Sequence, residues 1–140
     1  MIWKEQALAG APVETAFDSG TSTLEVGHQR LRVVSDNPVD VRAVGADGSA
    51  YRLSKRGLTV SHYEAVCDGR HYTARRAGGR GLGKRRDIRD ESGRLVAVTR
   101  GLPNGDLDVE LPAGEGFTLD VAFVSWALLL VDAPVRRTLY

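Results

Sequence analysis

The chain has 140 residues, of which 42% are hydrophobic and 26% are charged, and its formal net charge is +1. This length suits one folded domain, residues 1–140, and the near-neutral charge gives no reason to expect nucleic acid as a partner. The single cysteine, Cys67, excludes an intramolecular disulfide and is typical of a reducing compartment. We therefore expect a globular, cytoplasmic domain.

Residues 1–20 give no clear pattern. Their larger apolar residues, Trp3, Leu8, Val13 and Phe17, follow neither a helical nor a strand period. The Gly10–Pro12 segment interrupts any helix. We expect this segment to be peripheral or partly ordered, or to add a first strand. It contains no apolar run of signal-peptide length.

From residue 21 onward the pattern predicts short antiparallel strands separated by glycine turns. Three successive hairpins have turns near residues 46–48, 67–69 and 91–93. Keeping apolar residues on one face favours a three-residue loop in the first hairpin, which pairs Val41 with Leu53. The same rule pairs Ile88 with Val96 in the third. In the middle hairpin it favours a two-residue Asp68–Gly69 loop.

The segment from residue 117 to residue 132 predicts one helix near the C-terminus. Between Leu119 and Val131 only Asp120 and Ser125 are polar, and the apolar residues occupy every side of the helix. A helix without a polar face must be enclosed by protein or lipid. Its apolar run of about 13 residues is shorter than the roughly 20 needed to cross a bilayer, so we expect a core helix and not a transmembrane one.

These patterns together predict a mainly β fold with one α-helix. The expected architecture is an antiparallel β-barrel, or a strongly curved sheet, wrapped around the buried C-terminal helix. We count about nine or ten strands from the alternation and the turns. The helix is expected to contact the inward residues of these strands, namely Val41, Ala43, Tyr51, Leu53, Tyr72, Ala74, Ile88, Val96, Leu107 and Val109.

The hairpins DGSAYRL, DGRHYTA and ESGRLVAV, with the closing LDVELPAGEGFTLDVAFVSWALLLVD, resemble the tubby-like superfamily. The likeness spans residues 20–135 and is greatest to LURP-one-related proteins, with phospholipid scramblases as more distant relatives. It implies a closed antiparallel barrel around a hydrophobic C-terminal helix. It also implies a non-catalytic domain that binds phosphoinositide headgroups through basic side chains on the barrel surface.

A cluster of basic residues is the main candidate site. It comprises Arg75, Arg76, Arg80, Lys84, Arg85, Arg86 and Arg89, on a glycine-rich stretch. Guanidinium groups and backbone N–H groups could bind phosphate there, which makes anionic membrane lipid the expected partner. A charged strand edge that only prevents aggregation explains the same residues.

Other motifs in the sequence are weaker. Gly78 to Lys84 has the GxxxxGK spacing of a P-loop, but Arg85 replaces the Ser or Thr that ligates magnesium. His62, Cys67 and His71 match no zinc spacing, and in the chosen register Cys67 lies on the opposite face from both histidines. Asp120 is explained by the helix dipole. We expect no cofactor and no metal.

The leading interpretation is a non-catalytic binding or scaffold domain of the tubby and LURP-one type, cytoplasmic and associated peripherally with anionic membrane lipid. Two alternatives stay open. One is an enzyme or small-ligand binder with a site at the barrel mouth. The other is a protein interaction module in which the edge at residues 78–86 adds a strand to a partner protein.

Overall fold

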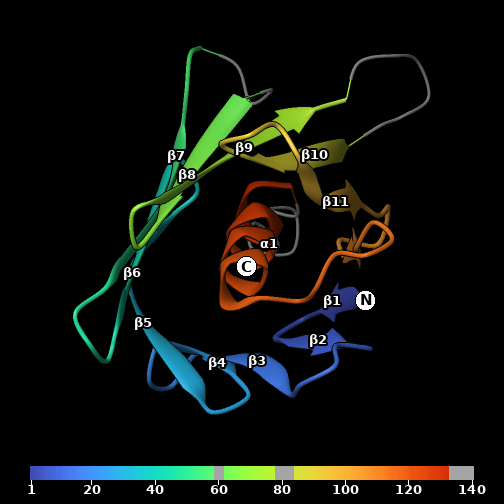
Figure 1. Cartoon of the computed structure of the whole chain (residues 1–140). Coiled ribbons are helices and arrows are strands. Elements are labelled where there is room, and N and C mark those ends of the chain that lie inside the picture. The colour runs from blue at the N-terminus through green and yellow to red at the C-terminus, as the bar shows by residue number, and fades with distance from the viewer. Residues whose placement is uncertain (59–61, 78–83, 133–140) are drawn as a thin grey trace.

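The computed structural model describes residues 1–58, 62–77 and 84–132 of the chain. In these residues the strands form one closed antiparallel barrel, and helix α1 (Leu119–Asp132) lies inside the ring of strands (Figure 1). The predicted fold, a mainly β barrel around a C-terminal helix, is confirmed. The helix begins at residue 119 and not at the predicted residue 117.

The described part of the chain contains twelve strands, and each pairs with its neighbours in sequence. They are β1 (Ile2–Lys4), β2 (Ala7–Ala9), β3 (Thr15–Asp18), β4 (Thr23–Val26), β5 (Gln29–Asn37), β6 (Asp40–Gly45), β7 (Ala50–Lys55), β8 (His62–Cys67), β9 (Arg70–Arg76), β10 (Arg85–Asp90), β11 (Leu95–Gly101) and β12 (Leu107–Glu110). Pairing of β1 with β12 closes the barrel.

Of the alternatives for residues 1–20, the peripheral one is wrong and the strand-forming one is confirmed, because this segment supplies strands β1 to β3. These strands have three or four residues each, too few for alternation to be visible in the sequence. Trp3 lies opposite Leu107 of β12 and is completely buried. Its indole Nε1 donates a 3.0 Å hydrogen bond to Oγ of Ser125 in α1. The first strand therefore closes the barrel and contacts the helix.

The hairpin registers agree with the sequence in two cases of three. Val41 lies opposite Leu53 as predicted, and Gly48 has a φ of 86°, the left-handed conformation that this turn requires. The predicted two-residue Asp68–Gly69 loop is also confirmed, with Cys67 opposite Arg70.

The third hairpin differs from the prediction by one residue. Ile88 pairs with Ala97 instead of Val96, and the register shifts between Ile88 and Arg89. A β-bulge places one extra residue in a strand, so two successive residues can lie on the same side. Val96 and Ala97 are accordingly both buried.

The interior is filled by α1 and the inward side chains of the strands. Eleven of the fourteen helix residues are buried, including Asp120 and Asp132 near its two ends. Oγ1 of Thr118 accepts a 3.1 Å hydrogen bond from the Val121 N–H group, which caps the N-terminus. The predicted helix neighbours all belong to or pack against the same core as α1, although Tyr72 is only partly buried.

Candidate functional site

The predicted basic cluster is divided between two faces of the barrel. Arg80 lies outside the described residues. In β9 and β10, successive side chains point to opposite faces, so Arg75 and Arg76 separate, as do Arg85 and Arg86. Only part of the cluster is therefore available on the surface.

Arg86 faces the interior and is completely buried. Its Nε is 2.7 Å from Oδ2 of Asp132 and its Nη2 is 3.0 Å from Oδ1, which makes a two-pronged ion pair with the last residue of α1. The guanidinium carbon also lies 5.1 Å from the ring centroid of Tyr63. The expectation that Arg86 belongs to a surface edge is wrong, because this side chain neutralises a buried carboxylate.

Two further cations converge on the same helix end. Nη2 of Arg76 is 3.5 Å from Oδ1 of Asp132, and Nζ of Lys84 donates a 3.0 Å hydrogen bond to the Asp132 carbonyl oxygen. Helix C-termini carry partial negative charge and favour cations. We call Arg76, Lys84, Arg86 and Asp132 the Asp132 cluster.

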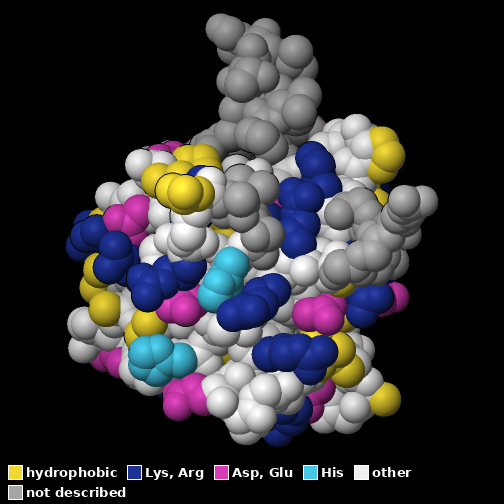
Figure 2. All heavy atoms as spheres, turned by 90° about the horizontal axis from the view of Figure 1, so that it is seen from above, with side chains coloured by type: hydrophobic (Ala, Val, Ile, Leu, Met, Phe, Trp, Pro, Cys, Tyr) yellow, Lys and Arg dark blue, Asp and Glu magenta, His cyan; other side chains and the backbone are white. Residues whose placement is uncertain are grey.

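The outward members of the predicted site are accompanied by acidic residues. Nε of Arg85 is 3.2 Å from Oδ1 of Asp87, and Nη2 of Arg89 is 3.5 Å from Oδ2 of the same carboxylate. Arg75 lies opposite both Asp87 and His62 in the sheet. In Figure 2, Lys and Arg side chains are likewise interspersed with Asp, Glu and His over this face.

The end of β7 adds two residues that the sequence analysis did not single out. The Arg56 N–H group donates a 2.9 Å hydrogen bond to the His62 carbonyl oxygen, which places Arg56 beside β8 at the end of the barrel where α1 finishes. Its Nε is 3.1 Å from Oε2 of Glu64. Leu58, two residues further, is 98% exposed. We call Arg56, Arg75 and Arg85 the basic rim.

A second polar group surrounds Asp120 at the other end of α1. Nε and Nη2 of Arg70 lie 2.7 and 2.9 Å from the two Asp120 oxygens, and the Tyr72 hydroxyl donates to Oδ2 at 2.5 Å. Nη2 of Arg70 is also 3.4 Å from the Tyr51 hydroxyl. Burial and the Asp120 charge raise the pKa of both tyrosines, which therefore stay protonated; Tyr72 donates to Asp120, and Tyr51 accepts from Arg70. Asp120, which was predicted to interact with the helix dipole, thus also forms an ion pair with Arg70.

The separation of Cys67 from the two histidines is confirmed. Cys67 faces the interior and is completely buried, and burial raises the pKa of its thiol, so it is not a ready nucleophile. His71 lies on the exposed outer face, opposite Val66. Burial and, less strongly, Arg75 lower the pKa of His62. Within the described residues, no three His, Cys, Asp or Glu side chains form a group that could hold a metal ion.

The edge-strand hypothesis does not apply to Arg85 and Arg86. Arg86 pairs with Arg76 of β9 on one side and with Thr99 of β11 on the other, and Arg85 pairs with Arg100 of β11. Closure of the barrel has removed the free edge here. The remaining part of the predicted edge, residues 78–83, which includes most of the P-loop-like spacing, lies outside the described residues.

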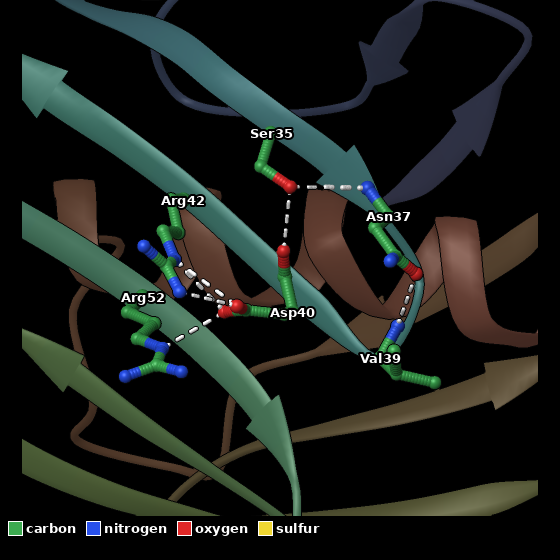
Figure 3. Close-up of polar contacts among 6 residues, drawn as sticks. All are labelled: Ser35, Asn37, Val39, Asp40, Arg42 and Arg52. Atoms are coloured by element: carbon green, nitrogen blue, oxygen red, sulfur yellow. Dashed lines mark hydrogen bonds and ion pairs between the residues drawn. The ribbon is translucent and has the colours of Figure 1, made fainter.

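Another arginine cluster lies on the outer wall of β6 and β7. Asp40 accepts hydrogen bonds from Nε and Nη2 of Arg42 and from Nε of Arg52, the shortest at 2.6 Å (Figure 3). The hydrogen bonds from these two arginines lower the pKa of Asp40 to about 2. The same strand end is fixed by Ser35, whose Oγ donates to the Asp40 carbonyl oxygen at 2.8 Å. The exposed side chains of Arg42 and Arg52 thus form ion pairs with the Asp40 carboxylate.

Within the described residues, no helix is long and apolar enough to span a membrane. No family model, curated protein or solved structure matches the chain.

Proposed function

We propose that this protein is a non-catalytic binding domain that docks on anionic membrane lipid through the basic rim and Leu58. The observation that carries the proposal is the position of Leu58, 98% exposed, two residues after the rim residue Arg56. Next to cations that attract anionic headgroups, an exposed apolar side chain can enter the boundary between headgroups and acyl chains. The resemblance to tubby and LURP-one-related proteins favours the same class of partner.

The charge of the rim supports an anionic partner. Three cationic residues are accompanied by two carboxylates, those of Glu64 and Asp87. Arg75 forms no ion pair within residues 1–58, 62–77 and 84–132, so its charge is available to a ligand. Near an anionic leaflet each Lys or Arg contributes about 1 kcal/mol of binding free energy.

The interior offers little support for catalysis. Its charged side chains are engaged with one another, Asp120 with Arg70 and Asp132 with Arg86. The one thiol of the chain is buried and protonated. A reaction centre needs accessible groups with matched pKa values, and the described interior presents packed apolar residues instead.

Vesicle co-sedimentation tests this proposal. The wild-type protein should bind vesicles of phosphatidylcholine with 20–30% phosphatidylserine and not vesicles of phosphatidylcholine alone, a range chosen to give the surface potential of an anionic leaflet. Arg56→Gln/Arg75→Gln should weaken binding roughly 10- to 30-fold, from about 1 kcal/mol per charge. Leu58→Ser should weaken it by a smaller factor, because it removes only the apolar contact.

The matched control is Arg30→Gln/Arg32→Gln, which removes two exposed charges from β5 at a distance from the rim. This variant should keep most of the binding. Equal loss in the rim and control variants would show unspecific charge attraction, and absence of binding by the wild-type protein would remove the proposal. Competition by inorganic phosphate, but not by chloride at equal ionic strength, would indicate that the rim recognises the phosphate group itself.

A further inference from the structure

Three buried polar atoms in one row of the barrel interior have no hydrogen-bond partner among the residues that the structure describes. They are Nε of Arg76, Nη1 of Arg86 and Oγ1 of Thr99. Arg86 lies directly opposite Arg76 in β9 and directly opposite Thr99 in β11. Directly opposed residues of antiparallel strands have Cβ atoms about 4.5–5.5 Å apart. The three residues therefore lie side by side across β9, β10 and β11.

Unpartnered groups of this kind are unusual in the interior of a folded protein. Arg86 and Thr99 are each completely buried, and the arginine side chains have donors and no acceptor. Buried polar atoms are nearly always satisfied by protein, ordered water or a bound ion. A row of three, two of them on charged side chains, indicates a bound species that accepts hydrogen bonds.

The charge at this end of α1 indicates an anion instead of water. Arg76, Lys84 and Arg86 carry three positive charges, whereas Asp132 supplies one negative charge. The C-terminal end of a helix adds about half a negative charge. Positive charge therefore remains in excess. It is poorly screened at the completely buried Arg86, whereas the Arg76 side chain is 30% exposed and Lys84 is exposed. A water molecule would accept the hydrogen bonds but would leave this excess unchanged.

We propose that the Asp132 cluster, together with Thr99, binds a small inorganic anion of halide size. Nε of Arg76, Nη1 of Arg86 and the Thr99 hydroxyl are its donors. The complete burial of Arg86 and Thr99 favours a small ion. The Lys84 side chain packs closely over the neighbouring Gly101, where an added Cβ atom would lie only 2.9 Å from Cδ of Lys84. The Arg76 side chain is 30% exposed and connects the site to solvent.

This site is independent of the proposed membrane function. The basic rim lies on the outer face, whereas the anion would lie inside the barrel at the end of α1. Its role is that of a buried counter-ion, which makes the stability of the barrel depend on the anion in solution. Loss of halide binding would leave vesicle binding in place, and the reverse also holds.

Chemical unfolding in matched salts tests the proposal. The wild-type protein should be more stable in sodium chloride than in sodium gluconate at the same ionic strength, and the difference should saturate with chloride concentration. Thr99→Val keeps the side-chain shape and removes one donor. It should weaken chloride affinity about tenfold or more, while the protein stays at least as stable in gluconate because no hydroxyl is left without a partner.

A second pair of variants tests whether the chloride effect depends on the position of the arginine or only on its charge. Arg76→Gln and Arg75→Gln remove the same charge from adjacent residues on opposite faces of β9. Only Arg76→Gln should reduce the chloride effect. Anomalous scattering from a bromide-soaked crystal should show a peak among Arg76, Arg86 and Thr99.

Equal stability of the wild-type protein in the two salts would overturn the proposal and indicate water at these atoms. The same conclusion would follow if Thr99→Val kept the full chloride dependence. If Arg76→Gln does not fold, the Thr99→Val titration and the bromide peak still decide the question.

Discussion

Each end of α1 carries a buried carboxylate that is bound by basic side chains, and the two ends differ in the number of these cations. At the N-terminal end, Asp120 is bound by one arginine, Arg70, whose side chain is 51% exposed, and by the Tyr72 hydroxyl. At the C-terminal end, Asp132 is bound by the completely buried Arg86, with Arg76 and Lys84 beside it. Both carboxylates are buried, yet their surroundings differ in charge and exposure.

The helix dipole explains this difference. A carboxylate near a helix N-terminus is stabilised by the partial positive charge there, so one cation and a hydroxyl are enough for Asp120. A carboxylate at the C-terminus faces partial negative charge, and Asp132 therefore requires more cations to be buried. The basic residues that stand out in the sequence of β9 and β10 are in part the consequence of this requirement.

The largest expected effect concerns the apolar helix between the two ends. Leu128 is completely buried in the middle of the core. Leu128→Asp places an unpaired carboxylate there and should cost more than about 5 kcal/mol, which is comparable with the total stability of a domain. We expect no soluble folded protein, as judged by expression yield and near-ultraviolet circular dichroism. A folded, soluble variant would show that α1 is not the core of the barrel.

The next prediction compares the two carboxylates directly. Asp132→Asn leaves the buried Arg86 without a counter-charge and should lower the free energy of unfolding by about 3–5 kcal/mol. Asp120→Asn should cost less, about 1–2 kcal/mol, because the half-exposed Arg70 can be hydrated when its partner is lost. Urea unfolding at pH 7 measures both values.

A double variant tests whether stability needs the Arg86–Asp132 ion pair itself or only the absence of an unpaired buried charge. Arg86→Met/Asp132→Leu replaces the ion pair by apolar side chains and should recover most of the stability lost in Asp132→Asn. If Asp120→Asn and Asp132→Asn lower the free energy of unfolding by similar amounts, neither the helix dipole nor the exposure of Arg70 explains the difference between the two ends of α1.

The sequence predicted the helix and much of the barrel because both depend on local patterns. An apolar run without a polar face indicates a buried helix wherever it occurs. Two hairpin registers followed from keeping Val41 with Leu53 and Ala65 with Tyr72 on one face. The bulge beside Val96 was missed because it depends on the local pairing of two strands. Strands β1 to β3 were not resolved because each has only three or four residues, and β1 is held by contacts made over more than 100 residues, such as Trp3 with Ser125.

The sequence pattern already implies that the basic cluster is divided between the two faces of the sheet. Ile88 was predicted to face inward, and a period of two places Arg86 on the same side. The inward prediction for Ala74 places Arg76 there as well. By contrast, Asp132 could not be identified as their partner, because it lies 46 residues after Arg86 in the chain. Long-range ion pairs of this kind depend on the assembled barrel.

The smallest expected effect concerns Asp40, a surface carboxylate held by two arginines and thus an exposed counterpart of Asp132. Arg42 and Arg52 lower its pKa to about 2 from the ordinary 3.8. A lowered carboxyl pKa contributes stability that is present above pH 3.8 and is lost as the pH falls toward 2. The side chains of both arginines are about half exposed, at 52% and 51%, so solvent screening limits this contribution to about 1 kcal/mol or less.

Asp40→Asn should therefore lower the free energy of unfolding by about 0.5–1 kcal/mol at pH 7 and by progressively less between pH 4 and pH 2.5. Urea unfolding of the wild-type protein and the variant across this range measures the difference. High salt should reduce it at pH 7, because exposed pairs are screened, whereas the cost of Asp132→Asn should change little. A difference that is constant with pH would show that the Asp40 carboxylate is not stabilised by its charge. A small, pH-dependent cost at Asp40 beside a large cost at Asp132 would show that burial, and not the number of arginines around a carboxylate, decides which ion pairs hold this barrel together.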